Sequence, residues 1–164
     1  MSATREQFNA ALSVLDRLID TEPGTPDRLW ISRSESIRLV KRSLQRDLKW
    51  LLNTRRVAQP PISMRELNRS VFVYGLPDFS DYALASADDR TRLLRDLESA
   101  IEMFEPRLDA VHVVPMEDQR HANAIWFRIE GLLLIEPAPE PVSFDTVLEL
   151  SSGEYQVKGE AHAG

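Results

Sequence analysis

Apolar side chains recur every three or four positions in three stretches of the chain, and this spacing predicts amphipathic helices. The first stretch covers about residues 4–20, and the Glu-Pro-Gly-Thr-Pro run of residues 22–26 that follows is typical of a linker. The second opens at Ser32, where Glu35 three positions later gives the pattern of a capping box. The third opens at Ser86. We therefore expect two helices in the main body and one set apart as an appendage.

In the last third of the chain apolar and polar positions alternate, which predicts β-strands. Val111 and Val113 mark one face of a first strand, and residues 124–135 give the strongest strand pattern. A final hairpin is expected at residues 144–158, closed by the Ser-Ser-Gly turn of residues 151–153. Helices followed by such strands predict the α+β class, with N-terminal amphipathic helices and then a small antiparallel C-terminal sheet.

Two regions between these elements are less regular. Residues 67–74 fit either a short helix or an extended piece, and the pattern leaves both open. Pro137, Pro139 and Pro141 are not expected inside a central strand, because proline has no N–H to donate to the ladder. These prolines therefore predict a connector or a protected edge.

The length of 164 residues suits one main domain with a core of its own. We expect an N-terminal helix and linker at residues 1–26, a single α+β domain at 27–158 and a short tail at 159–164. The longest apolar run, residues 131–135, is too short to cross a bilayer. A soluble, cytoplasmic protein without direct membrane insertion is therefore expected.

The net charge of −6 is distributed unevenly along the chain. Residues 28–69 hold 11 basic and three acidic residues, whereas the remainder holds nine basic and 23 acidic residues. Much of the positive charge lies on the second helix, where Arg38, Arg42 and Lys49 could bind an acidic surface or RNA. A solvated helix face is favoured over that adaptor role, and no nucleic-acid partner is expected, since the isoelectric point is about 5.1.

The sequence offers little catalytic chemistry. It has no cysteine, which excludes disulfides and thiolate metal sites. His112, His121 and His162 do not stand at metal-ligand spacing, and no phosphate-binding glycine loop is present, so we expect neither a metal nor a cofactor. Glu102 and Glu105 are the nearest candidates for a pair of catalytic carboxylates.

The Glu105-Pro106-Arg107 step follows the third helix and forms a stiff charged corner. The residue before a proline is biased away from helical dihedrals, and proline itself fixes φ and donates no hydrogen bond. Two opposite charges are thus held between a helix and the strand that begins near Val111. Such a corner can lock the fold, supply a catalytic acid or contact a partner.

Four runs of the sequence together resemble the TssE family, the baseplate wedge subunits of type VI secretion systems. That family is related to the tail-baseplate wedge protein of contractile phages. The runs are Arg46-Asp-Leu-Lys-Trp-Leu-Leu-Asn-Thr-Arg55, Ser70-Val71 with Tyr74-Gly-Leu-Pro-Asp-Phe79, Phe104-Glu-Pro-Arg-Leu108, and Phe144-Asp145-Thr146. The likeness covers about residues 8–158, and it departs at Val73, where family members more often have Asn.

The resemblance implies an assembly protein and not an enzyme. Its expected partners are the baseplate subunits TssF and TssG and the sheath proteins TssB and TssC, and TssK is a further candidate. In this interpretation Glu105, Pro106 and Arg107 carry the contact that holds the wedge together. The protein would act in the cytoplasm, at a baseplate docked on the inner membrane.

The resemblance also implies a docking surface for the first ring of the contractile sheath. Sheath subunits interlock by exchanging strands, and an open sheet edge can accept a partner strand. The hairpin of residues 144–158, which includes Phe144, Asp145 and Thr146, is therefore the expected docking edge.

The main alternative is a lysozyme-like enzyme, a label that the family has also carried. A peptidoglycan hydrolase would need two carboxylates, one of them in an apolar cleft that raises its pKa. The sequence supplies many acids but no residue pattern that supports such a pair. Assembly is therefore favoured over catalysis.

Overall fold

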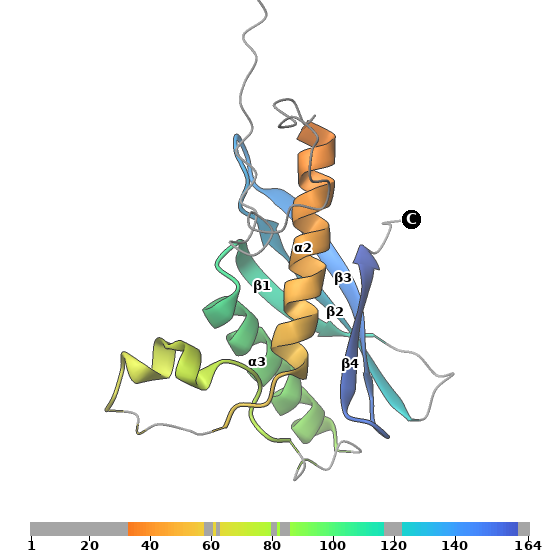
Figure 1. The fold of residues 1–164 in the computed structure, drawn as a ribbon. Helices are drawn as coiled ribbons and strands as arrows, with labels where there is room; N and C mark the ends of the chain where they lie inside the picture. Colours follow the sequence, from red (N-terminus) through yellow and green to blue (C-terminus); the bar gives the residue numbers. More distant parts are fainter. Residues whose placement is uncertain are drawn as a thin grey trace, which may run out of the picture.

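The computed structural model describes residues 33–57, 61, 63–79, 82, 86–116 and 123–160 of the chain. Within these residues, two α-helices pack on one face of a four-stranded antiparallel sheet (Figure 1). The helices come first and the strands follow, which confirms the predicted α+β class. The helix expected at about residues 4–20, its linker and Ser32 of the expected capping box lie outside the described residues.

Each helix buries an apolar stripe because its large apolar residues recur at helical spacing. The helices are α2 (Arg33–Asn53) and α3 (Ala87–Phe104), and α3 begins directly after Ser86, as predicted. The side chains that are completely buried on these stripes are Leu44, Leu48, Leu52, Leu97 and Ile101. Both stripes join the inner face of the sheet in one hydrophobic core.

The sheet has the strand order β1-β2-β3-β4. Its strands are β1 (Leu108–Pro115), β2 (Ala124–Leu133), β3 (Glu140–Glu149) and β4 (Glu154–Glu160). Alternate side chains face the helices, so Val111 and Val113 are buried whereas His112 and Val114 are exposed, as the period of two predicts. The edge strands are therefore β1 and β4, and β3 lies inside the sheet.

The proline-rich connection between β2 and β3 contains both of the predicted alternatives, a connector and a local edge. Pro137 and Pro139 lie in the connector, but Pro141 is the second residue of β3 and pairs with Leu132 of β2. This position is tolerated because the pairing of β4 with β3 ends at Phe144. The opposite side of Pro141 thus faces no strand, and the position is locally an edge.

The region at residues 67–74, which the pattern left open, is helical. It forms two short 3-10 turns, η1 (Leu67–Arg69) and η2 (Val71–Val73), separated by Ser70. Val73, which stands where the resembled family more often has Asn, is buried at the end of η2. An apolar residue here anchors the second turn.

Gly75 lets the chain pass close to the end of α2. Its φ of 104° is in the region that favours glycine, and an added Cβ would lie 2.4 Å from the Thr54 carbonyl oxygen. The neighbouring residue Leu76 accepts a hydrogen bond from the Arg56 N–H and donates one to Thr54, each at 2.8 Å. The Tyr-Gly-Leu run is therefore fixed against α2 by backbone bonds.

The basic outer face of α2 is only partly a solvated surface. Lys41 forms an ion pair with Glu140 at 2.9 Å, and Arg46 pairs with Asp47 at 2.8 Å. Arg38, Arg42 and Lys49 are exposed. Among the described residues, no helix is long and apolar enough to span a membrane.

Candidate functional site

The Glu-Pro-Arg corner ends α3 and leads directly into β1. The Glu105 N–H makes the last helical bond, to the Ile101 carbonyl at 2.8 Å, and Pro106 then supplies no donor. The Leu108 N–H donates back to the Glu105 carbonyl at 3.1 Å, which closes a tight turn. The sequence thus stops the helix and starts the strand within four residues.

Glu105 and Arg107 face each other inside this turn. The Arg107 Nε donates to Glu105 Oε1 at 2.6 Å, and Nη2 donates to Oε2 at 2.5 Å. This is the two-bond geometry in which a guanidinium binds a carboxylate most strongly. Only 5% of Glu105 is exposed, so the pair is largely withdrawn from water.

Arg107 also connects the corner to the middle of α2. Its Nη2 donates to Asp47 Oδ2 at 2.7 Å, and its Nη1 donates to the Ser43 hydroxyl at 3.0 Å. We call Ser43, Asp47, Glu105 and Arg107 the corner cluster. Burial disfavours the charged guanidinium, but hydrogen bonds and charge attraction from Glu105 and Asp47 outweigh it and raise the pKa of Arg107.

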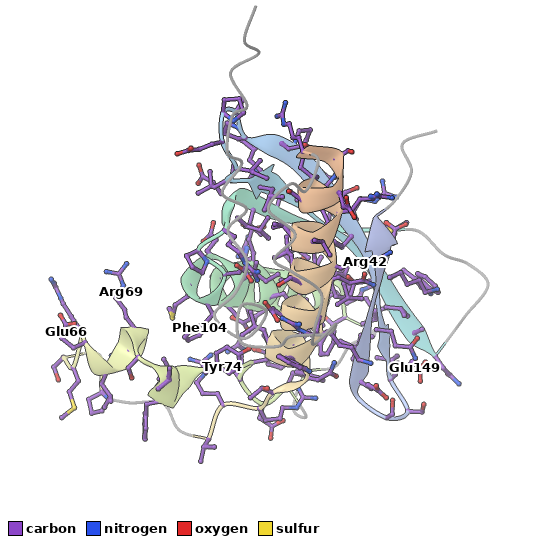
Figure 2. All side chains as sticks on the ribbon, turned by 45° about the horizontal axis from the view of Figure 1, so that its top comes forward. Arg42, Glu66, Arg69, Tyr74, Phe104 and Glu149 are labelled. Carbon is purple, nitrogen blue, oxygen red and sulfur yellow. The ribbon has the colours of Figure 1, made fainter. Side chains whose placement is uncertain are left out.

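Tyr74 brings a further segment to the corner cluster. Burial raises the pKa of its phenol, and the nearby negative charges of Asp47 and Glu105 raise it further. The Tyr74 ring meets the Phe104 ring edge to face, with 5.2 Å between their centroids. Figure 2 shows the two labelled residues near each other at the base of the molecule. Three of the four runs that carry the family resemblance therefore meet in space.

The predicted wedge-contact residues are used mainly within the chain. Glu105 and Arg107 bind each other and α2, whereas Pro106 is exposed. The corner is thus a lock for the fold, one of the alternatives that the sequence left open. A partner contact at this motif stays a prediction.

The predicted docking residues of the hairpin point to both faces of the sheet. Phe144 and Thr146 are buried in the central strand β3, so their side chains belong to the interior. Asp145 faces the other side and accepts a bond from the Arg128 Nε of β2 at 2.6 Å. Sheath binding by this hairpin also stays a prediction.

The outer edge of β4 is occupied by side chains from α2 and the residues that follow it. Asn53 acts like a residue of a fifth strand: its Nδ2 donates to the Tyr155 carbonyl at 2.8 Å and its Oδ1 accepts from the Tyr155 N–H at 2.9 Å. Gln45 donates to the Val157 carbonyl at 2.9 Å and Arg55 to the Gly153 carbonyl at 3.2 Å. We call Gln45, Asn53 and Arg55 the edge clasp. The expectation of an open edge along this hairpin is therefore wrong at these positions.

The β1 edge is protected by different means. Its Val113 N–H donates to the Glu98 carboxylate of α3 at 3.0 Å, and Pro115 has no N–H. The register shifts between Asp109 and His112, where Ala110 has a φ of 48°. A bulge and a proline both discourage the addition of a strand. Each helix thus covers one edge of the sheet.

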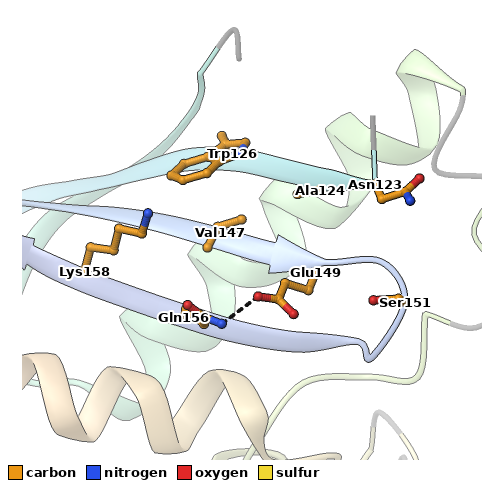
Figure 3. Close-up of a pocket in the computed structure, with 8 residues that line it drawn as sticks. All are labelled: Asn123, Ala124, Trp126, Val147, Glu149, Ser151, Gln156 and Lys158. Atoms are coloured by element: carbon orange, nitrogen blue, oxygen red, sulfur yellow. Dashed lines mark hydrogen bonds between the residues drawn. The ribbon is translucent and has the colours of Figure 1, made fainter. Parts of the chain in front are cut away.

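A shallow groove lies on the opposite face of the sheet. It measures about 430 Å³ and runs beside the β3–β4 turn (Figure 3). The Lys158 Nζ lies 4.1 Å from the centre of the Trp126 ring, and Gln156 donates to Glu149 at 2.6 Å. These contacts are within the chain, and they give the groove no evident chemistry.

Possible metal ligands and the candidate catalytic carboxylates can be located among the described residues. No group of three or more possible metal ligands is found among them. Arg107 binds both carboxylate oxygens of Glu105, whereas the hydrolase alternative needs a carboxyl group within hydrogen-bond reach of a substrate. Its expected companion Glu102 is exposed on α3.

Sequence reasoning missed Asp47, Ser43 and the edge clasp as functional partners. Asp47 stood in one of the resembling runs, and it was one of only three acids in the basic stretch of residues 28–69. The position of Asp47 as an isolated acid in a basic helix was therefore the signal for an ion pair within the fold. For Asn53 the signal was weaker, because an amide near a helix end is common.

Taken together, the fold and the corner cluster define a small α+β protein whose buried charges hold its helices and sheet together. A family model for baseplate wedge protein gp25 matches residues 38–138, which is more than half of the chain. The chain belongs to this baseplate wedge family, which has a structural role in phage-like baseplates. Neither a curated protein nor a solved structure gave a match.

Proposed function

We propose that this chain is the TssE-type wedge subunit of a type VI secretion baseplate and that it binds TssF and TssG. The observation that supports the proposal best is the corner cluster, where three of the four resembling runs converge. Asp47, Tyr74 and the Glu105–Arg107 pair come from segments far apart in the chain. Runs that meet at one buried cluster are better explained by a shared architecture than by chance likeness.

A rigid corner suits a subunit that must hold others in a fixed arrangement. The cluster ties the end of α3, the start of β1 and the middle of α2 together by charge-assisted bonds. A surface that is ordered before its partner arrives loses less conformational entropy on binding. In the proposal, Pro106 and the exposed surface around it face TssF and TssG.

The experiment is co-expression of the tagged full chain with TssF and TssG. We expect the three proteins to elute together in size-exclusion chromatography, with the chain alone eluting separately. A well-folded chain that leaves TssF and TssG unbound would overturn the proposal. Because corner variants are expected to lose stability, this test relies on the unchanged chain and needs no mutation.

We further propose that the residue 144–158 hairpin faces the sheath proteins TssB and TssC, with TssK as an additional baseplate partner. The edge clasp changes how this could occur, since a strand can pair with Tyr155 only after Asn53 is displaced. Binding of purified TssB–TssC to the immobilised chain tests the contact. Absence of binding at all salt concentrations would remove it.

No observation favours the peptidoglycan hydrolase alternative. Purified cell wall incubated with the chain should release no soluble fragments between acidic and neutral pH. Turnover that survives a Glu105→Gln substitution would indicate a different active site. Turnover that this substitution abolishes would restore Glu105 as the catalytic acid only if the variant is as stable to urea as the unchanged chain.

A further inference from the structure

Residues 63–73, which we call the arm, project from the body of the protein. Figure 1 shows this segment, with η1 and η2, extending to one side of the helices and sheet, and Figure 2 places Glu66 and Arg69 on it. The two turns pack on each other, and neither packs extensively on another described helix or strand. The arm therefore adds little to the core.

The arm carries large apolar side chains on its surface. Val71 is 88% exposed and Phe72 is 52% exposed, and Met64, near the start of the arm, is 52% exposed. At the base of the arm, Met103 of α3 is also exposed and lines a shallow depression with Arg65 and Arg69. Scattered exposed apolar residues are ordinary, but several on one projecting segment mark an interaction surface.

Hydrogen bonds hold the arm in shape. The Ser70 hydroxyl donates to the Leu67 carbonyl at 2.8 Å and accepts from the Phe72 N–H at 3.3 Å, which links the two turns. Asn68 donates to the carbonyls of Pro61 and Met64, both at 2.9 Å. Val71 and Phe72 are thus presented by a structured backbone that is ready to bind.

The charges of the arm indicate the kind of surface that it fits. Arg65 and Arg69 are exposed and form no ion pair within the part of the chain that the structure describes, and Glu66 is the only acid among residues 63–73. Arginine and aromatic side chains are among the types that dominate protein interfaces, and the arm exposes both. The complementary surface is apolar at its centre and acidic at its rim.

We propose that the arm inserts Val71 and Phe72 into an apolar, acid-rimmed groove on another baseplate subunit. Arg65 and Arg69 pair with the acidic rim and orient the arm, and Phe72 fills the groove. This proposal rests on the proposed function for the identity of the partner, the TssF–TssG complex. It places the contact on a surface separate from the corner cluster.

The test compares binding of the purified TssF–TssG complex to the chain and to its Phe72→Asp variant. We expect the variant to bind at least about tenfold more weakly, because an aromatic anchor is replaced by a charge that repels the acidic rim. The matched control is Leu150→Asp, which changes an exposed apolar residue in the β3–β4 turn and should bind like the unchanged chain. Thermal unfolding should be the same for all three, since neither side chain is part of the core.

A second variant tests the charge of the partner groove. Arg65→Glu with Arg69→Glu should also weaken binding about tenfold, and binding of the unchanged chain should weaken as salt rises. Salt-independent binding would contradict the acidic rim.

Three further outcomes would overturn the proposal in distinguishable ways. If the unchanged chain does not bind TssF–TssG, the proposed function fails together with this partner. If Phe72→Asp binds as well as the unchanged chain, only the arm proposal fails. If the unchanged chain alone self-associates and Phe72→Asp does not, the occupant is a second copy of this chain.

Discussion

At the scale of single residues, Arg107 has the most connected role in the described structure. It binds Glu105 two positions away and Asp47 sixty positions away, and both contacts are largely buried. The sequence predicted the stiff corner because proline chemistry is local. It could not predict the Asp47 contact, because that depends on how α2 lies against the corner.

Replacing Arg107 by Met should strongly destabilise the fold. The substitution leaves Glu105 and Asp47 without their shared cation, and breaking a buried pair from one side typically costs about 3–5 kcal/mol. Urea unfolding at neutral pH measures the change. Arg38→Met changes an exposed arginine of α2 and should alter the free energy of unfolding by less than about 0.5 kcal/mol. Equal stability of the two variants would contradict the lock.

Tyr155 should make the fold sensitive to high pH. Burial raises the pKa of its phenol, and attraction from Arg55 offsets this only in part. An unfolded tyrosine ionises near pH 10, so stability should fall as the pH rises above about 10, where only the unfolded phenol loses its proton. Urea unfolding of Tyr155→Phe should show a shallower decline in this range, and an unchanged pH slope would count against the assignment.

At the scale of elements, the hydrophobic period predicted the type of both α-helices and of the strands, but it left open the type of residues 67–74. It placed the start of α3 at Ser86 and separated Val111 and Val113 from His112, because burial follows the spacing of apolar residues. It did not show that β4 is closed. Edge protection depends on amide and carboxylate side chains from distant parts of the chain, and these residues do not recur at a regular spacing in the sequence.

The close passage at Gly75 should be intolerant of any side chain. An added Cβ at Gly75 would meet the Thr54 carbonyl at 2.4 Å, and the φ of 104° would itself be strained. Gly75→Ala should therefore lower the free energy of unfolding by about 2 kcal/mol or more. Gly159→Ala is the matched control, since a Cβ there meets nothing within 4 Å. An unchanged free energy of unfolding in Gly75→Ala would show that the backbone around Gly75 can move away from Thr54 at little cost.

Removing the central amide of the edge clasp should expose β4. Asn53→Ala leaves the Tyr155 N–H and carbonyl open to another strand, so we expect lower stability by about 1–2 kcal/mol and stronger association with a strand donor. Light scattering reports self-association, and binding to TssB–TssC reports sheath docking. Gln156→Ala, an amide on the same strand bonded only to Glu149, should change neither. Unchanged association in Asn53→Ala would argue against docking by strand addition.

At the scale of the whole molecule, one core unites the two α-helices and the four strands. Its buried members run from Val40 to Val157. Composition and length led to the prediction of a single main domain, because the fraction of surface that folding buries rises with chain size, and that prediction still needs a test. The uneven charge distribution could also be recognised in the sequence. Which basic residues form ion pairs and which stay exposed could not be predicted, because Lys41 and Arg46 pair with acids that the fold brings to them.

The predicted domain boundary can be tested by truncation. The described members of the core begin at Val40, inside the predicted domain, so we expect a chain that lacks residues 1–26 to unfold in one cooperative transition with the midpoint of the full chain. Differential scanning calorimetry of both chains gives the comparison. A lower midpoint for the shortened chain would assign residues 1–26 to the domain.

The edge clasp has a consequence for the order of folding. Asn53 and Tyr155 are 102 positions apart, so these bonds join the first and last described elements of the chain. During synthesis, α2 leaves the ribosome long before its strand partner exists, and contacts over such distances form late and slowly. Within β4, the clasp side chains bond only to the backbone N–H and C=O groups that point away from β3. A shift of the β3–β4 register by one residue would turn those groups toward β3. We therefore expect the clasp to close late in folding, and only on a β4 strand that is already in its correct register.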